Sequence, residues 1–374
     1  MIPFNKPYLT GKETAYIQEA VHLGKISGNG QFTKRCQDFF ERKYGFKKCL
    51  LTTSCTDALE MAAILCNIKP GDEVIVPSYT FVSTALAFVR QGAKVVFADS
   101  YGHHPNIDAD KVEQLITPLT RAIVPVHYAG VACDMDKIMS LANKYKLFVI
   151  EDAAQAIDSY YKDKALGSIG HLATFSFHET KNIISGEGGL LAINDEQFLR
   201  RAEIIWEKGT NRAEFFRGEV NKYGWIDIGS SFLPSELIAA FLWAQIENID
   251  DIQIKRKKIW NTYYEYLKPL SAKGCFTIPE IPVYATNNAH IFYMLCNSLE
   301  EREKLLSYLK VHDVLAVFHY LSLHCSPFYK DKHDGRELNN CNHFSDCLVR
   351  LPLYYELGLD QTIKIANLII ENYE

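Results

Sequence analysis

The sequence predicts an α/β protein built around a mostly parallel sheet, and three observations support this fold class. Short apolar runs alternate with segments of helical periodicity through the first half of the chain. The runs are apolar at consecutive positions, as expected for strands buried on both faces between helices. No repeat or low-complexity stretch interrupts the alternation. We count seven candidate strands, which predicts one large sheet domain.

Two helical segments precede the first strand. Residues 11–24 show an apolar face, residues 27–30 break the helix, and a second apolar stripe at helical spacing covers residues 32–40. The candidate strands are 48–53, 73–77, 94–98, 121–126, 147–152, 173–177 and 189–193. Helical patterns between most of them cover 56–66, 83–91, 110–116 and 136–145. We expect residues 197–250 to be largely helical, except for the polar and aromatic segment 208–231.

A change of pattern near residue 250 predicts a second domain. A long helix, 252–267, is expected to cross into it and to stop at Pro269, which cannot continue a helix. The remaining elements are helices at 299–311 and 360–373 and short strands at 290–296 and 315–319. We therefore divide the chain into a large α/β domain, residues 1–250, and a small α+β C-terminal domain, residues 251–374.

The composition excludes several classes of protein. The 374 residues are 48% hydrophobic and 23% charged, and the net charge of −5 gives no electrostatic footprint for nucleic acid or anionic lipid. The ten cysteines show no C-x-x-C pair and no zinc-type spacing, so we expect reduced core thiols and no metal site. The first residues lack the pattern of a signal peptide, and no apolar run reaches the roughly 20 residues of a membrane span. We therefore expect a cytoplasmic protein.

Lys181 is the first candidate for chemistry. It lies on a short polar turn after the predicted strand 173–177, and a glycine-rich break at 186–189 follows. Desolvation in such a place would lower the pKa of the lysine and leave a nucleophilic free amine, as Schiff-base chemistry requires. The alternative is a solvated loop lysine, which is the usual state of this residue type.

A possible phosphate site lies at the start of helix 56–66. The N-terminus of a helix offers free N–H groups and a positive dipole end, which suit a phosphate. Cys55 would contribute its amide, and Thr56 its amide and hydroxyl, whereas simple N-capping is the alternative. Ser176, shortly before Lys181, could add another hydroxyl.

Two further strand ends carry residues that suit a planar, phosphorylated cofactor. Asp152 ends a buried strand, and ligands of open α/β sheets bind outside the carboxyl ends of the strands. A carboxylate there could hold a protonated pyridine nitrogen, as in pyridoxal phosphate enzymes, or it could cap a helix. Phe81 follows the strand 73–77 and could stack on such a ring, or belong to the core. Because these residues all follow or end predicted strands, we interpret them together as one candidate cofactor site.

Six stretches carry a resemblance to a known family. They are SCTDAL (54–59), PGDEVIVPSYTF (70–81), PVHYAG (125–130), EDAAQ (151–155), FSFHETK (175–181) and HYLSLH (319–324). On these residues the chain closely resembles the DegT/DnrJ-type sugar aminotransferases, pyridoxal-phosphate enzymes that act on nucleotide-linked keto-sugars. The resemblance runs nearly end to end. It implies a fold-type I transferase with a large α/β domain, a small C-terminal domain and a homodimer with shared active sites.

The same resemblance implies a role for each matching residue. Lys181 would form the internal aldimine and act as the proton-transfer base, and Asp152 would hold the pyridine nitrogen. Gln155 would lie against the ring and its 3-oxygen, and Phe81 would stack on the ring. The phosphate would be bound by Cys55, Thr56 and Ser176.

Three positions depart from the family pattern. Ser231 stands where the family has an asparagine that reaches the partner subunit's phosphate, and Leu233 stands at a basic position. A serine can still donate one hydrogen bond, so Ser231 remains a candidate for that contact. Cys55 replaces a common glycine, which matters little when only its amide is used.

Two segments, EKGTNR (207–212) and FFRG (215–218), resemble one subgroup of the family. Its members make dTDP-4-amino-4,6-dideoxygalactose for enterobacterial common antigen, an O-antigen or a related surface glycan. The resemblance implies amino transfer from L-glutamate to C4 of dTDP-4-keto-6-deoxy-D-glucose, in a ping-pong cycle through pyridoxamine phosphate. Arg212 could bind the diphosphate with its guanidinium fork, and His319 and Tyr320 are the other candidate substrate contacts.

Other functions remain open at this point. A C3 aminase, or an enzyme giving the 4-amino-glucose epimer, would share every cofactor residue. Family members that dehydrate sugars carry a histidine in place of the lysine, so the presence of Lys181 favours transamination. A non-catalytic or regulatory protein on the same fold would not need Lys181 or Asp152, and both are present.

Overall fold

The structure is a computed structural model of the whole chain, and it describes residues 1–374. Seven strands form one sheet in the order β1-β9-β8-β5-β4-β2-β3. Their bounds are Lys48–Thr52 (β1), Glu73–Pro77 (β2), Lys94–Ala98 (β3), Thr120–Ile123 (β4), Phe148–Asp152 (β5), Leu172–Ser176 (β8) and Gly189–Ile193 (β9). Only β9 is antiparallel to its neighbours. The predicted α/β class and mostly parallel sheet are confirmed, and each of the seven strands predicted for this sheet overlaps an observed one.

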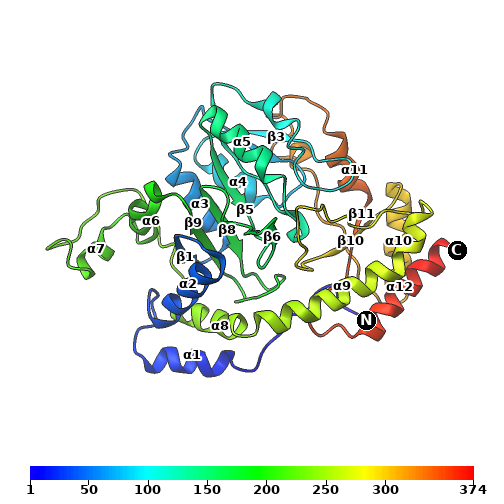
Figure 1. Cartoon of the computed structure of the whole chain (residues 1–374), viewed down its shortest axis with the longest axis horizontal. Coiled ribbons are helices and arrows are strands. Elements are labelled where there is room, and N and C mark those ends of the chain that lie inside the picture. The colour runs from blue at the N-terminus through cyan, green and yellow to red at the C-terminus, as the bar shows by residue number, and fades with distance from the viewer.

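Helices cover both faces of the sheet (Figure 1). Successive side chains of a strand point to opposite faces, so Leu190 and Leu191 of β9 belong to the cores on opposite sides. One face is covered by α2 (Gln31–Tyr44), α5 (Met135–Tyr145) and α8 (Glu236–Ile246). The other is covered by α3 (Cys55–Leu65), α4 (Ser83–Arg90) and α6 (Leu199–Trp206). The first helix, α1 (Glu13–His22), packs on α8. The continuous apolar runs thus supply two cores at once.

The long helix α9, Ile249–Ala272, leads from the sheet to the C-terminal part of the chain (Figure 1). Ile252 in its first half packs in a core of the sheet, and Leu267 packs in a separate C-terminal core. The prediction that this helix stops at Pro269 is wrong, because it continues to Ala272. Pro269 lies in the last turn, where its missing N–H removes only one hydrogen bond and little helix follows it.

A two-stranded antiparallel sheet of β10 (Phe292–Leu295) and β11 (Leu348–Leu351) forms the centre of the C-terminal part. The helices beside it are α10 (Leu299–Val311), α11 (Asn339–Cys347) and α12 (Leu359–Tyr373), so both predicted helices are confirmed. The predicted strand 315–319 is wrong, since only Val317 pairs, in a single bridge with Arg350. Ile2 pairs with Val314 and joins this core, and the division at residue 250 stays a prediction.

Two segments differ from a simple alternation of strands and helices. The predicted helix 110–116 is only a single 3-10 turn, Val112–Leu115. Residues 208–231 form an extension, called the arm below, which carries the short helix α7 (Arg212–Phe216) and projects away from the body (Figure 1). An ion pair of 2.7 Å between Arg201 Nε and Asp227 Oδ2 ties the arm to α6. None of the helices combines the length and apolar character needed to cross a membrane.

Candidate active site

Lys181 lies on the loop between β8 and β9, residues 177–188, which we call the lysine loop. Backbone hydrogen bonds close this loop on itself: Phe177 N donates to Gly188 O at 2.8 Å, and Glu179 N donates to Gly186 O at 2.9 Å. Lys181 N donates to His178 O at 2.9 Å. Gly186 has a φ of 81°, a conformation that favours glycine. The glycine-rich break seen in the sequence therefore shapes the turn that positions Lys181.

The residue after the lysine ties this loop to the rest of the molecule. Asn182 is buried, and its Nδ2 donates to Gln253 Oε1 of α9 at 2.8 Å and to Asn288 O at 2.9 Å. Its Oδ1 lies 2.9 Å from His290 Nδ1, which donates to it. Burial, together with the charge of Lys181, lowers the pKa of His290 well below its ordinary value, so this histidine is neutral. Asn182 and His290 were not among the residues found from the sequence.

The amine of Lys181 is desolvated, as the Schiff-base interpretation requires. Its pKa falls to about 8, mainly because burial disfavours the ammonium form. Cys55 and the Asp152 carboxylate oppose this effect, whereas the guanidinium of Arg350 adds to it. Close to neutral pH the lysine therefore has a far larger free-amine fraction than a solvated lysine. The interpretation of Lys181 as an ordinary solvated loop residue does not match this environment.

Asp152 ends β5 at the carboxyl edge of the sheet and is 5% exposed. Thr84 Oγ1 donates to its Oδ2 at 2.7 Å, and Ala154 N donates to its Oδ1 at 3.2 Å. Burial raises the pKa of Asp152, and these two hydrogen bonds partly offset that rise. The carboxylate is thus held in one orientation beside the lysine amine.

A fully buried carboxylate, Glu151, fixes the chain immediately before Asp152. Three backbone N–H groups of the turn 167–170 donate to it at 2.6–2.8 Å, and His127 Nε2 donates at 2.9 Å. His127 Nδ1 accepts from Cys133 N at 3.1 Å, so the ring proton is on Nε2. A buried charge is tolerated when it is fully hydrogen-bonded. Glu151 and His127 therefore keep the end of β5 rigid rather than acting on a ligand.

The start of α3 has the properties of a phosphate site. The N–H groups of Cys55 and Thr56 have no acceptor within the chain, and Thr56 Oγ1 lies 2.7 Å from Ser83 Oγ. Ser176 ends β8 opposite Gly189, and a Cβ at Gly189 would lie 2.5 Å from the Cys55 nitrogen. Free N–H groups at the positive end of a helix, with hydroxyls beside them, fit the phosphate of a cofactor.

Aromatic residues line the side of the site next to the C-terminal part. Phe81 is 55% exposed rather than buried in the core, and its ring centroid lies 5.8 Å from that of Tyr320. Gln155 Nε2 donates to Tyr320 Oη at 3.4 Å, and Gln155 Oε1 accepts from Ala129 N at 2.7 Å. Tyr79 Oη accepts from Tyr320 N at 2.8 Å. The backbone that carries Tyr320 is thus held against the end of β2.

Arg350 of β11 also faces this region, and no sequence pattern pointed to it. Its Nη1 donates to His319 Nδ1 at 3.1 Å. Burial and the charge of Arg350 lower the pKa of His319 to about 4, so that ring is neutral. The guanidinium also lies 5.0 Å from the centroid of the Phe4 ring.

The structure brings most of the predicted site residues to one edge of the sheet. They are Cys55, Thr56, Phe81, Asp152, Gln155, Ser176, Lys181, His319 and Tyr320. Arg212 and Ser231 do not join them within one chain. Arg212 is exposed on the arm, 5.2 Å from the ring centroid of Phe216. Ser231 is exposed at the base of the arm, where it pairs with Glu207. The arm projects away from this edge, and the contact of Arg212 with substrate stays a prediction.

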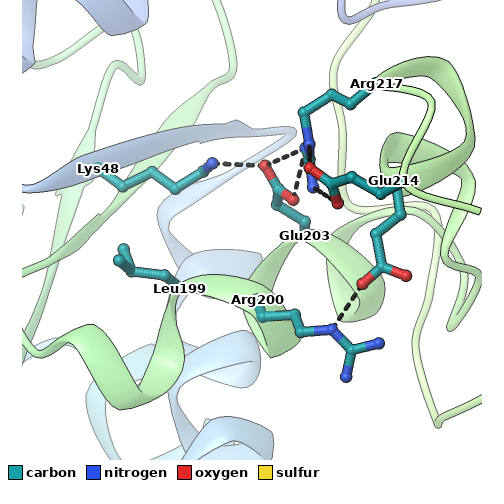
Figure 2. Close-up of a pocket in the computed structure, with 7 residues that line it drawn as sticks. Lys48, Leu199, Arg200, Glu203, Glu214 and Arg217 are labelled. Atoms are coloured by element: carbon teal, nitrogen blue, oxygen red, sulfur yellow. Dashed lines mark hydrogen bonds and ion pairs between the residues drawn. The ribbon is translucent and has the colours of Figure 1, made fainter.

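A cavity of about 400 Å³ lies at the base of the arm, away from this edge (Figure 2). Its charged side chains are paired with one another: Arg217 with Glu203 at 2.9 Å, Arg200 with Glu214 at 2.6 Å, and Lys48 with Glu203. Because these charges satisfy each other, the cluster anchors α7 to α6 and offers no free group to a ligand.

Amino-group transfer through pyridoxal phosphate is the chemistry for which the carboxyl edge of this sheet is suited, and the fold is that of fold-type I transferases. The chain belongs to the DegT/DnrJ/EryC1/StrS aminotransferase family, whose model matches residues 7–370. The protein is thus a pyridoxal-phosphate-dependent nucleotide-sugar aminotransferase, as the family resemblance predicted.

Known relatives match the chain over almost its whole length. It is 32% identical over 378 residues to the GDP-perosamine synthase of Escherichia coli O157:H7, covering 100% of this chain and 98% of that one. It is 31% identical over 380 residues to the spore coat polysaccharide biosynthesis protein SpsC of Bacillus subtilis, covering 98% and 96%. The fold matches a putative sugar aminotransferase of Streptococcus pneumoniae in its PMP form with a TM-score of 0.92, at 24% identity over 100% of this chain and 99% of that one.

Proposed function

We propose that this aminotransferase moves the amino group of L-glutamate to the C4 keto group of dTDP-4-keto-6-deoxy-D-glucose. The product is dTDP-4-amino-4,6-dideoxy-D-galactose, a precursor of a surface glycan such as enterobacterial common antigen. The observation that carries the transamination is the desolvated amine of Lys181 beside the oriented carboxylate of Asp152. The choice of sugar is supported by segments 207–212 and 215–218 of the arm, which resemble the subgroup with this activity.

The residues at the sheet edge have distinct tasks in this proposal. Pyridoxal phosphate, when bound, supplies a carbonyl that condenses with amines and a ring that accepts the electron pair of a deprotonated carbon. Lys181 would provide the nucleophilic amine and, in each half-reaction, would move the proton between the substrate carbon that bears the nitrogen and the cofactor. Asp152, oriented by Thr84, keeps a proton on the ring nitrogen. Phe81 and Gln155 pack on the ring.

The phosphate and the substrate are held by groups on both sides of the ring. The free N–H groups of Cys55 and Thr56 bind the phosphate, with a hydroxyl from Ser176. His319 and Tyr320 contact the substrate from the C-terminal part of the chain. Tyr320 suits this task because its hydroxyl meets the side chain of Gln155 at 3.4 Å.

The arm is the part that we propose to act in a homodimer with shared active sites. It exposes large apolar side chains, with Phe216 at 69%, Trp225 at 85% and Ile228 at 56%. Large exposed apolar side chains gathered on one segment are typical of an interaction site. A second copy covering the arm brings Arg212 to the diphosphate of the sugar nucleotide and Ser231 to the cofactor phosphate of its partner.

A GDP-linked keto-sugar is the second candidate substrate, since a relative 32% identical over 378 residues is a GDP-perosamine synthase. Two further alternatives, amination at C3 and formation of the 4-amino-glucose epimer, differ from our proposal only in the product that is formed. The test mixes the holoenzyme with L-glutamate and then with dTDP-4-keto-6-deoxy-D-glucose, or with the GDP-linked precursor of perosamine. We expect the visible cofactor band to disappear with glutamate and to return with the dTDP-sugar.

The product is then identified by NMR, which reports both the aminated carbon and its configuration. Return of the band only with the GDP-sugar would replace our substrate with the second candidate. No visible band after incubation with pyridoxal phosphate would refute the role of Lys181.

A further inference from the structure

Arg350 is a buried arginine whose side chain has only neutral hydrogen-bond partners and no counter-charge. It is 6% exposed and forms no ion pair with a carboxylate. Its Nη1 donates to His319 Nδ1 at 3.1 Å, and the Tyr320 hydroxyl is a second side-chain hydrogen-bond partner, whereas its buried Nε has no partner. A buried guanidinium without a counter-charge is costly, so a structure that keeps one provides an anion for it in its working state.

Other buried arginines of the chain have carbonyl or carboxylate acceptors. Arg256 of α9 donates to the carbonyls of Ala289 at 3.1 Å, His290 at 2.8 Å and Leu353 at 3.3 Å. Arg302 of α10 donates to Ser345 O at 2.7 Å and pairs with Glu303. Arg350 has neither carbonyl nor carboxylate acceptors for its side chain. The difference suggests that Arg350 is not there to brace the fold.

The position of Arg350 points its charge toward the site. β11 holds its backbone, with Arg350 N donating to Val317 O at 2.7 Å. The His319 ring that accepts its hydrogen bond stacks on Tyr320, with centroids 5.5 Å apart. The charge of Arg350 lowers the pKa of Lys181, as expected for a cation near the reacting amine. Arg350 therefore faces the region between the C-terminal part and the lysine.

We propose that Arg350 binds the α-carboxylate of the amino-acid donor, with the neutral His319 beside it as a further hydrogen-bond donor. This inference rests on the transamination proposed above. A guanidinium fork pairs with a carboxylate through two parallel hydrogen bonds, which fixes the plane of the donor.

Chemistry separates the donor from the other anions of the reaction. The α-carboxylate is attached to the carbon that bears the reacting nitrogen, so its binding group has to lie near Lys181. The diphosphate of a sugar nucleotide is on C1, across the sugar ring from C4. The cofactor phosphate has its own N–H groups at Cys55 and Thr56. Of the anions in the proposed reaction, the donor α-carboxylate therefore fits the position of Arg350.

The first experiment measures the two half-reactions separately by stopped-flow absorbance. Holoenzyme is mixed with L-glutamate, and pyridoxamine-phosphate enzyme is mixed with whichever keto-sugar nucleotide the wild type accepts. For Arg350→Gln we expect the apparent second-order rate constant with L-glutamate to fall about 30- to 100-fold, the effect of losing a charged hydrogen-bonded pair. Arg350→Lys should recover part of the loss, and the sugar half-reaction should change less than about 3-fold. The matched control is Arg302→Gln, another buried arginine with an unpartnered Nε, which should leave both half-reactions intact.

A second ligand keeps the test decisive if Arg350→Gln does not fold. 4-Aminobutyrate is glutamate without the α-carboxylate, so we expect wild type and Arg350→Lys to react with it equally slowly. The inference would be overturned if the ratio of the wild-type rate constant to the Arg350→Lys rate constant were the same for L-glutamate and for 4-aminobutyrate. It would also be overturned by a loss confined to the sugar half-reaction, which would assign Arg350 to the diphosphate, or by equal losses in both halves, which would make it structural. If the wild type itself forms the visible band but reacts with no amino acid, the proposed transamination fails first and this inference falls with it.

Discussion

At the carboxyl edge of the sheet the candidate side chains are held by their own chain, whereas on the arm they face solvent. Asp152 receives two hydrogen bonds, and Asn182 ties the lysine loop to α9. On the arm, Trp225 and Phe216 are exposed and Arg212 finds only the ring of Phe216 and a distant carboxylate. The chemical groups are therefore preorganised in a single copy, whereas the function that we propose for the arm requires a second molecule to cover it.

Removing the lysine amine tests the first half of this comparison most strongly. Lys181→Ala should lower turnover by about 10⁴-fold or more, because no other amine can hold the cofactor covalently or move the proton. The visible absorption of bound cofactor should be lost, and added pyridoxal phosphate should wash out on dialysis. The matched control is Lys162→Ala, which removes an exposed lysine paired only with Asp136. Turnover within about 10-fold of the wild type in Lys181→Ala would disprove the role of this residue.

Asp152→Asn keeps the shape of the side chain but removes its charge. We expect the rate of amino transfer to fall about 10²- to 10³-fold, as for other preorganised electrostatic contacts, with the cofactor still bound. Single-turnover absorbance with L-glutamate measures this directly. Asp136→Asn is the control, since that carboxylate is exposed and pairs with Lys162. Equal rates in the Asp152 variant and its control would remove Asp152 from the mechanism.

For the arm, by contrast, we expect a substitution to weaken association between copies. Trp225→Ala removes the most exposed large ring of the arm, so the melting temperature should hardly change while the dimer dissociation constant rises about 30-fold. Sedimentation equilibrium over a range of protein concentrations measures the change. The control is Val283→Ala, a fully exposed apolar residue that lies outside the arm. A wild-type protein that is monomeric at all concentrations would contradict the proposed role of the arm.

The parts of this site that the sequence predicts are those encoded by local pattern. Lys181, Asp152 and Phe81 each follow an apolar run of strand length, and all these runs end at the same edge of one parallel sheet. Strand periodicity and the rule for ligand sites in open sheets are therefore enough to collect them. The helix N-terminus at Cys55 is visible for the same reason.

What the sequence does not predict depends on contacts between distant segments. Arg350 is on a strand that formed no separate apolar signal, and its meeting with His319 depends on the pairing of β11 with Val317. His290 reaches Asn182 only because the C-terminal part folds back on the lysine loop. The prediction of a helix end at Pro269 was wrong for a related reason. Local propensity marks a helix end there, whereas tertiary packing of α9 lets the helix continue to Ala272.

The smallest effect concerns the protonation of Lys181. Its pKa of about 8 lies below the ordinary value of about 10.4, so the free amine should rise from roughly a tenth at pH 7 to nine-tenths at pH 9. Capture of pyridoxal phosphate by the apo-protein, trapped with borohydride, should therefore accelerate about 10-fold over this interval and then level off. A solvent-exposed lysine has an ordinary pKa of about 10.4, so its rate of capture would instead keep rising above pH 9. Asp152→Asn should move the midpoint to lower pH, because the carboxylate raises the pKa of Lys181. A midpoint near 10 in the wild type would mean that the lysine is solvated, and the contrast between a buried edge and an exposed arm would then fail at its central residue.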